Sequence, residues 1–140
     1  MNRQSNRLFE EWKQHGKIIV SVDYDDTLRP WMYSTQEDCD NLIIFLKEVK
    51  RTGAYIVVFT ASDDSRHDEI FKYCKTKGLD IDTINQNPIS LPYGNQGKIF
   101  YNINLCDRSG LNEARETLSK AMYKYRGWKQ SNPSREDIDF

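Results

Sequence analysis

Two aspartates, one residue apart, follow the first apolar run of the chain. Asp23 and Asp25 come after the segment KIIVSV, and residues two apart in an extended backbone project to the same side. Because like charges at this spacing repel, ionisation of both carboxylates calls for a compensating cation. Mg²⁺ prefers oxygen ligands, and Asp107, at the end of a later apolar run, offers a third carboxylate. The sequence therefore predicts a magnesium site built from Asp23, Asp25 and Asp107.

Three further residues, at or near the ends of apolar runs, have the groups that a phosphoryl group needs. Thr60 offers a hydroxyl, Ala61 a backbone N–H and Lys98 a positive charge. Hydrogen-bond donors and a cation are what phosphoryl oxygens require. We therefore expect Thr60, Ala61 and Lys98 to bind phosphate beside the acidic residues.

These residues need a scaffold that brings the ends of several strands to one place. Strands that alternate with helices of crossover length indicate an α/β fold with a doubly wound, Rossmann-like parallel sheet. We expect helices on both faces, strand order 4-1-2-3 and no large cap domain; ligands bind such sheets beyond the carboxyl ends of the strands. Periodicity predicts strands at 17–23, 54–60, 80–84 and within 98–107, and helices at about 5–14, 35–51, 65–77 and 111–126.

Local signals refine two of these helices. Ser34 and Glu37 form a capping box at the start of the helix at 35–51. In the helix at 65–77, the spacing of apolar residues predicts that Phe71 faces inward. Arg66 and Arg108 either contact the substrate or are solvated, and solvated side chains are the favoured interpretation.

Four segments in order along the chain resemble the motifs of the haloacid dehalogenase-like phosphohydrolase superfamily. They are VSVDYDDTL, YIVVFTAS, Lys98 and NINLCDRSG, which lie within residues 17–110. The chain is most similar to the small, nearly capless members found in bacteria and phages. The resemblance implies a phosphatase that hydrolyses a phosphomonoester through an aspartyl-phosphate intermediate.

The same resemblance implies a role for each site residue. Asp23 would be the nucleophile, and Asp25 would protonate the leaving oxygen and then take a proton from water. Mg²⁺ would be held by the Asp23 carboxylate, the Asp25 main-chain carbonyl and Asp107. Thr60 and Lys98 would hold the phosphoryl oxygens.

One departure from the motifs concerns the metal. The last motif usually carries two acids, whereas this chain has Cys106 followed by Asp107. A thiol is a soft and poor ligand for Mg²⁺. If the acid that usually stands at position 106 is the direct metal ligand, the site has lost a negative charge and binds metal weakly. If Asp107 is the metal ligand instead, activity survives.

The segment after the nucleophile is too short for an inserted cap domain, because a helix is expected to begin near residue 35. The site should therefore be open. The aromatic residues Trp31 and Tyr33 lie in this segment, where they either cover the substrate or pack locally. An open site beside aromatic side chains favours a nucleotide or the terminal phosphate of a nucleic acid as substrate.

Composition bounds the remaining possibilities. The chain of 140 residues is expected to form one domain over residues 1–128, with a polar, mobile tail at 129–140. Twenty basic and twenty-one acidic residues argue against a wholesale electrostatic grip on nucleic acid. We see no apolar run of the ~20 residues that would span a bilayer, no secretory signal and only three dispersed cysteines. These features indicate a cytoplasmic protein without a membrane partner, of unknown oligomeric state.

Two other functions are compatible with the same residues. A phosphoacceptor signalling module also combines clustered aspartates, a threonine and a lysine on a doubly wound sheet. A non-catalytic binding protein that keeps the scaffold would be consistent with Cys106 in the last motif.

Overall fold

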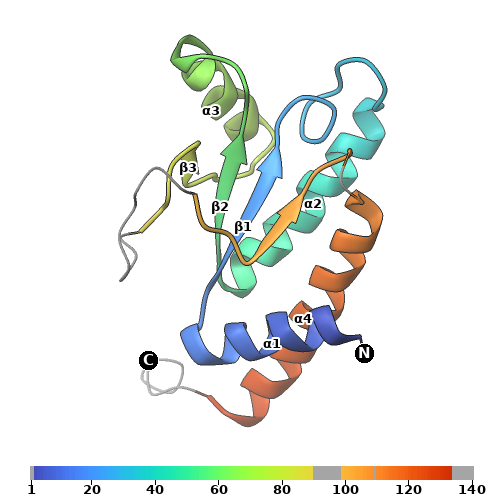
Figure 1. The fold of residues 1–140 in the computed structure, drawn as a ribbon, viewed down its shortest axis with the longest axis vertical. Coiled ribbons are helices and arrows are strands. Elements are labelled where there is room, and N and C mark those ends of the chain that lie inside the picture. The colour runs from blue at the N-terminus through green and yellow to red at the C-terminus, as the bar shows by residue number, and fades with distance from the viewer. Residues whose placement is uncertain (1, 90–98, 109, 134–140) are drawn as a thin grey trace.

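A computed structural model describes residues 2–89, 99–108 and 110–133 of the chain. Helices and strands alternate through most of its length (Figure 1). Lys98 lies outside the described residues, as do residues 134–140 of the expected tail. The elements are α1 (Arg3–His15), β1 (Ile18–Asp23), α2 (Gln36–Gly53), β2 (Ala54–Phe59), the 3₁₀ turn η1 (Asp64–Arg66), α3 (His67–Thr76), β3 (Thr83–Ile84), β4 (Ile103–Leu105) and α4 (Leu111–Ser131).

The four strands form one parallel sheet in the order β3-β2-β1-β4. The predicted α/β fold, with a doubly wound parallel sheet, strand order 4-1-2-3 and flanking helices, is confirmed. β1 lies in the centre, where it pairs with β2 from Ile18 to Asp23 and with β4 from Val20 to Val22. The carboxyl ends of β1, β2 and β4 therefore meet at one edge of the sheet.

Buried side chains fill the space between the sheet and the helices. Figure 1 shows α2 running behind the sheet and α1 crossing α4 near the amino ends of the strands. At the edge of β1 that pairs with β4, Asn102 bonds with Ile19: its backbone N–H donates to the Ile19 carbonyl at 2.8 Å, and its Oδ1 accepts from the Ile19 N–H at 2.6 Å. The core includes Leu8, Trp12, Val20, Val22, Leu42, Leu46, Ile56, Val58, Ile70, Leu105, Leu118 and Met122.

Both outer strands are short; β3 is shorter than the sequence predicts, whereas β4 lies within the predicted range 98–107. β3 covers only Thr83–Ile84, instead of 80–84, and β4 only Ile103–Leu105. Side chains next to both strands make hydrogen bonds to the sheet in place of a regular ladder. The Asp82 carboxylate accepts from the Ile56 N–H at 2.7 Å, and Oδ1 of Asn102 accepts from the Ile19 N–H. Side-chain oxygens thus replace carbonyls at these edges.

Helix boundaries also differ from the expected ones. The N-cap of α2 is Thr35, whose hydroxyl accepts from the Asp38 N–H at 3.1 Å, whereas the hydroxyl of Ser34 donates to the Asp26 carbonyl. The predicted capping box is therefore wrong, because the preceding loop uses Ser34. α4 continues to Ser131, past the expected boundary at residue 128, since Trp128 still packs against the core.

The prediction for Phe71 is also wrong. Its side chain is exposed, whereas Ile70 and Cys74 on the same helix are buried. Ile70, Tyr73 and Cys74, spaced three and four residues apart, form the side of α3 that packs against the core, and Phe71 lies outside it. In the part of the chain that the structure describes, no helix is both long enough and apolar enough to cross a membrane.

Candidate active site

A pocket of about 480 Å³ lies at the carboxyl edge of the sheet. Four carboxylic acids from the ends of β1 and β4 line it, together with the residues that follow β2. This is the place at which a doubly wound sheet binds ligands. The lining residues are Asp23, Tyr24, Asp25, Asp26, Trp31, Phe59, Thr60, Ala61, Asp107 and Arg108.

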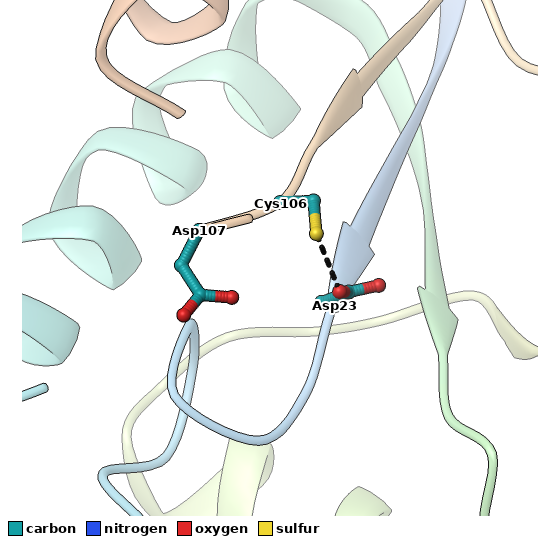
Figure 2. A group of neighbouring side chains, drawn as sticks. All are labelled: Asp23, Cys106 and Asp107. Carbon is teal, nitrogen blue, oxygen red and sulfur yellow. Dashed lines mark hydrogen bonds between the residues drawn. The ribbon is translucent and has the colours of Figure 1, made fainter. Parts of the chain in front are cut away.

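Asp23 and Asp107 come together at this edge, with Cys106 between them. One carboxylate oxygen of each aspartate and the Cys106 sulfur all lie within 4.8 Å of one another. Figure 2 shows the Cys106 thiol pointing at Asp23, to whose Oδ2 it donates with an Sγ–Oδ2 distance of 2.7 Å. The Asp107 side chain extends toward the loop after β1, where its Oδ1 accepts from the Thr27 hydroxyl at 3.4 Å.

The Asp25 carboxylate is not part of this cluster. Its Oδ2 lies 3.3 Å from Nη1 of Arg66, and its Oδ1 lies 3.6 Å from Nη1 of Arg29. Arg66 also donates to the Ser62 hydroxyl at 2.6 Å, and its guanidinium lies 5.6 Å from the centre of the Tyr24 ring. Of the three predicted carboxylates, the structure thus gathers two and turns the third toward two arginines.

Asp26 holds the next segment of the loop. It has a left-handed backbone (φ 61°), which aspartate tolerates better than most residues. Its Oδ1 accepts from the backbone N–H groups of Trp31, Met32, Tyr33 and Ser34 at 2.9–3.2 Å. Burial opposes ionisation of Asp26, but these four bonds outweigh it and lower the pKa of the carboxyl below its usual value.

The predicted phosphate-binding residues Thr60 and Ala61 line the pocket. Thr60 is fixed by Asn85, whose side chain accepts from the Thr60 N–H at 3.0 Å and donates to the Thr60 carbonyl at 2.9 Å. The Thr60 hydroxyl oxygen accepts from the Ser62 N–H at 3.1 Å, so its own O–H can serve as a donor. The position of Lys98 is not described.

The two predicted aromatic residues differ in placement. Trp31 lines the pocket, whereas Tyr33 is not among the lining residues. Both side chains are exposed, with exposed fractions of 62% for Trp31 and 77% for Tyr33. Local packing of these two rings is therefore limited.

Sequence reasoning missed six residues that line this site or pair with its carboxylates: Tyr24, Asp26, Arg29, Phe59, Arg66 and Arg108. Arg66 was interpreted as solvated, yet it pairs with Asp25, because η1 places it one turn after Ser62 at the end of β2. Its position just after the strand end was a usable signal. Asp26 differs: nothing in the run DYDDT distinguishes the acid that closes the loop from its neighbours.

The donor set can be compared with the needs of Mg²⁺. Two carboxylates on adjacent strands that converge within 4.8 Å fit a cation with oxygen ligands. The Cys106 sulfur does not fit, because thiols are soft ligands. The hydrogen bond from Cys106 occupies one lone pair of Asp23 Oδ2, which leaves the other lone pair and Oδ1 for a cation.

Comparison with known proteins adds a likeness of fold. Neither protein-family models nor curated proteins match this chain. Among solved structures, the chain is similar to a conserved protein coded by a locus from Bacteroides thetaiotaomicron, with 16% sequence identity and a TM-score of 0.56. The match covers 89% of this chain and 98% of that chain. At this identity the likeness concerns the fold alone.

Proposed function

We propose that the protein is a magnesium-dependent phosphatase that hydrolyses a phosphomonoester through an aspartyl-phosphate on Asp23. The observation that carries the proposal is the convergence of the Asp23 and Asp107 carboxylates in a pocket that Thr60 and Ala61 also line. A nucleophile, a charge-compensating site and donors for phosphoryl oxygens are the parts that this reaction requires.

The chain's own residues have distinct roles in this proposal. The Asp23 carboxylate attacks phosphorus, and the ester oxygen leaves with a proton from Asp25. Asp25 then takes a proton from the water that cleaves the aspartyl-phosphate. The Thr60 hydroxyl and the Ala61 N–H hold the phosphoryl oxygens, with Lys98 assigned the same role from its place in the sequence.

The ion would be held by Asp23, Asp107 and the main-chain carbonyl of Asp25. When bound, Mg²⁺ supplies positive charge that offsets the repulsion between the nucleophile and the phosphoryl oxygens. Arg29 and Arg66 compensate the charge of the Asp25 carboxylate. Arg108, which lines the pocket, places a positive charge where an anionic ester would bind.

The hydrogen bond from Cys106 to Asp23 favours a second candidate, a non-catalytic binding protein. A thiol that donates to the nucleophilic carboxylate reduces the electron density available for attack on phosphorus. The two candidates differ in one measurable respect, which is turnover of an ester in the presence of Mg²⁺.

The test is the release of p-nitrophenol from p-nitrophenyl phosphate with and without Mg²⁺. We expect hydrolysis by the wild-type protein and a loss of about a thousandfold or more for Asp23→Asn and for Asp25→Asn. Asp80→Asn is the matched control, because Asp80 is an exposed aspartate outside this pocket. A wild-type rate equal to that of Asp23→Asn would exclude the phosphatase, and a long-lived aspartyl-phosphate would favour a signalling module.

A further inference from the structure

Three consecutive large apolar side chains are exposed beside the pocket. Trp31, Met32 and Tyr33 have exposed fractions of 62%, 61% and 77%. By contrast, Trp12 is fully buried in the core. Scattered apolar residues on a surface need no explanation, but three in a row at the edge of a polar pocket indicate a surface that meets a ligand.

The backbone beneath these side chains is held in place. The four N–H groups from Trp31 to Ser34 all donate to Oδ1 of Asp26, and the Ser34 hydroxyl donates to the Asp26 carbonyl. A ligand that binds to a fixed surface does not have to order it, which favours affinity. The backbone that carries Trp31, Met32 and Tyr33 is therefore organised before a ligand arrives; we call these three exposed residues the aromatic platform.

The same hydrogen bonds limit what the platform can recognise. Because the backbone N–H groups from Trp31 to Ser34 point at Asp26, they are not available as donors to a ligand. A sugar, whose hydroxyls need hydrogen-bond partners, would find none in these four N–H groups. A planar ring gains from stacking, which requires no hydrogen-bond partner.

The platform is continuous with the candidate active site. Trp31 lines the pocket that also holds Asp23, Asp107 and Thr60. Arg108, which also lines the pocket, adds a positive charge. A ligand that joins a phosphate to a flat ring would place its two ends on these two parts of one pocket.

We propose that the substrate is a phosphomonoester that carries a nucleobase, and that the base stacks on Trp31 while the phosphate lies beside Asp23. The inference rests on the proposed phosphatase function and specifies its substrate. Two sources share this chemistry: a mononucleotide and the phosphorylated end of a single-stranded nucleic acid. Met32 and Tyr33, which extend the platform beyond the pocket, favour contact with a second base in the latter.

The decisive experiment compares Trp31→Leu with Trp31→Phe. Leucine keeps an apolar side chain without a π-face, whereas phenylalanine keeps the face. For adenosine 5′-monophosphate we expect Trp31→Leu to lower kcat/KM about tenfold, mainly through KM, and Trp31→Phe to restore most of it. For glycerol 2-phosphate, which has no ring to stack, Trp31→Leu should lower kcat/KM much less than it does for the nucleotide. Equal losses for both esters, or none for the nucleotide, would overturn the proposal.

A second arm distinguishes the two sources. Hexathymidylate with a 5′-phosphate is compared with thymidine 5′-monophosphate in wild type and in Tyr33→Leu. A nucleic-acid end predicts a higher kcat/KM for the hexamer and a loss of that advantage in Tyr33→Leu. A mononucleotide substrate predicts equal values for both esters and no effect of Tyr33→Leu. A hexamer preferred equally by both proteins would contradict the platform.

A binding measurement tests stacking of the base independently of the proposed phosphatase activity. Adenosine 5′-monophosphate is titrated into the full-length Asp23→Asn protein while tryptophan fluorescence is recorded. Quenching that is absent from the Asp23→Asn, Trp31→Phe double variant supports base stacking even if no ester is hydrolysed. Hydrolysis of glycerol 2-phosphate without any quenching by the nucleotide would retain the phosphatase and reject the base.

Discussion

The two ends of the sheet are built from different chemistry, although β1 runs through both. At the amino end, the fully buried Trp12 stacks on Tyr125 at 5.2 Å and donates through Nε1 to the Gly53 carbonyl at 2.9 Å. At the carboxyl end, a pocket of about 480 Å³ is lined by four carboxylic acids. Apolar burial stabilises a fold, whereas converging carboxylates repel.

Stability is therefore assigned to the amino end of the sheet and chemistry to its carboxyl end. Substitutions at the amino end should lower the free energy of unfolding and leave the pocket intact. Substitutions at the carboxyl end that add no charge should change binding or turnover and leave stability at neutral pH almost unchanged. Each prediction below tests that separation.

The largest expected effect is on stability, from Trp12→Ala. Loss of a fully buried indole, its ring stack and its hydrogen bond should lower the free energy of unfolding by about 3–5 kcal/mol. Urea denaturation followed by far-ultraviolet circular dichroism measures it. Trp12→Phe, which keeps an aromatic ring, is a milder variant should alanine prevent folding. Trp31→Ala is the matched control, with an expected change within about 0.5 kcal/mol; equal losses at the two positions would refute the separation.

Two arginines with matching contacts allow a closer comparison. Arg66 bonds the Ser62 hydroxyl and Asp25, and Arg126 bonds the Thr52 hydroxyl at 2.7 Å and Glu48 at 2.9 Å. Arg66→Ala should lower kcat about tenfold, because Asp25 loses the partner that orients it. Arg126→Ala should leave kcat unchanged.

Two measurements control the comparison of the arginines: the free energy of unfolding of Arg126→Ala and the kcat of Arg66→Lys. Arg126→Ala should lower the free energy of unfolding by about 1 kcal/mol, as expected for a partly exposed ion pair with hydrogen bonds. Arg66→Lys should recover part of the kcat lost in Arg66→Ala, since it keeps the charge. A lower kcat in Arg126→Ala would contradict the assignment of chemistry to the carboxyl end alone.

Cys106→Asp tests whether Mg²⁺ binds beside residue 106. A third carboxylate beside Asp23 and Asp107 should tighten Mg²⁺ binding by about tenfold, measured by isothermal titration calorimetry. Without Mg²⁺ the same variant should melt at a lower temperature, because like charges repel. Cys106→Ser keeps a donor to Asp23 and should bind Mg²⁺ as the wild type does. Unchanged affinity in Cys106→Asp would show that the ion does not bind beside this residue.

The smallest effect is expected at Tyr24, whose buried hydroxyl has no hydrogen-bond partner in the part of the chain that is described. Tyr24→Phe should change the free energy of unfolding at pH 7 by less than about 0.5 kcal/mol. Burial raises the pKa of Tyr24 from 10.0 to about 12. The folded protein holds the phenolic proton more tightly than the unfolded chain does. The contribution of this proton to the free energy of unfolding is therefore complete below pH 10 and is lost as the pH rises toward 12.

Tyr24→Phe should therefore lose less stability than the wild type between pH 10 and 12, as followed by denaturation at fixed pH. Parallel curves for the two proteins would show that the phenol titrates normally. A large loss at pH 7 would show that the hydroxyl has a structural partner.

Much of the scaffold followed from local patterns. The β-branched runs IIVSVD and AYIVVF are strands because they are apolar enough to be buried on both faces, and their crossover helices determine that they are parallel. The length of β3 was overestimated, since the Asp82 side chain takes over a hydrogen bond that a longer ladder would make. Such replacements leave no periodic signal in a sequence.

By itself, the sequence determined the order of the strands and hence that Asp23 and Asp107 reach the same edge, because parallel strands connected by helices end on one side. The different roles of the neighbouring acids Asp25 and Asp26 follow only from their tertiary contacts. Asp25 faces Arg29 and Arg66, whereas Asp26 turns into the loop through a left-handed backbone. These choices depend on partners that come from other elements or from several residues later in the loop, and no spacing of residue types specifies them.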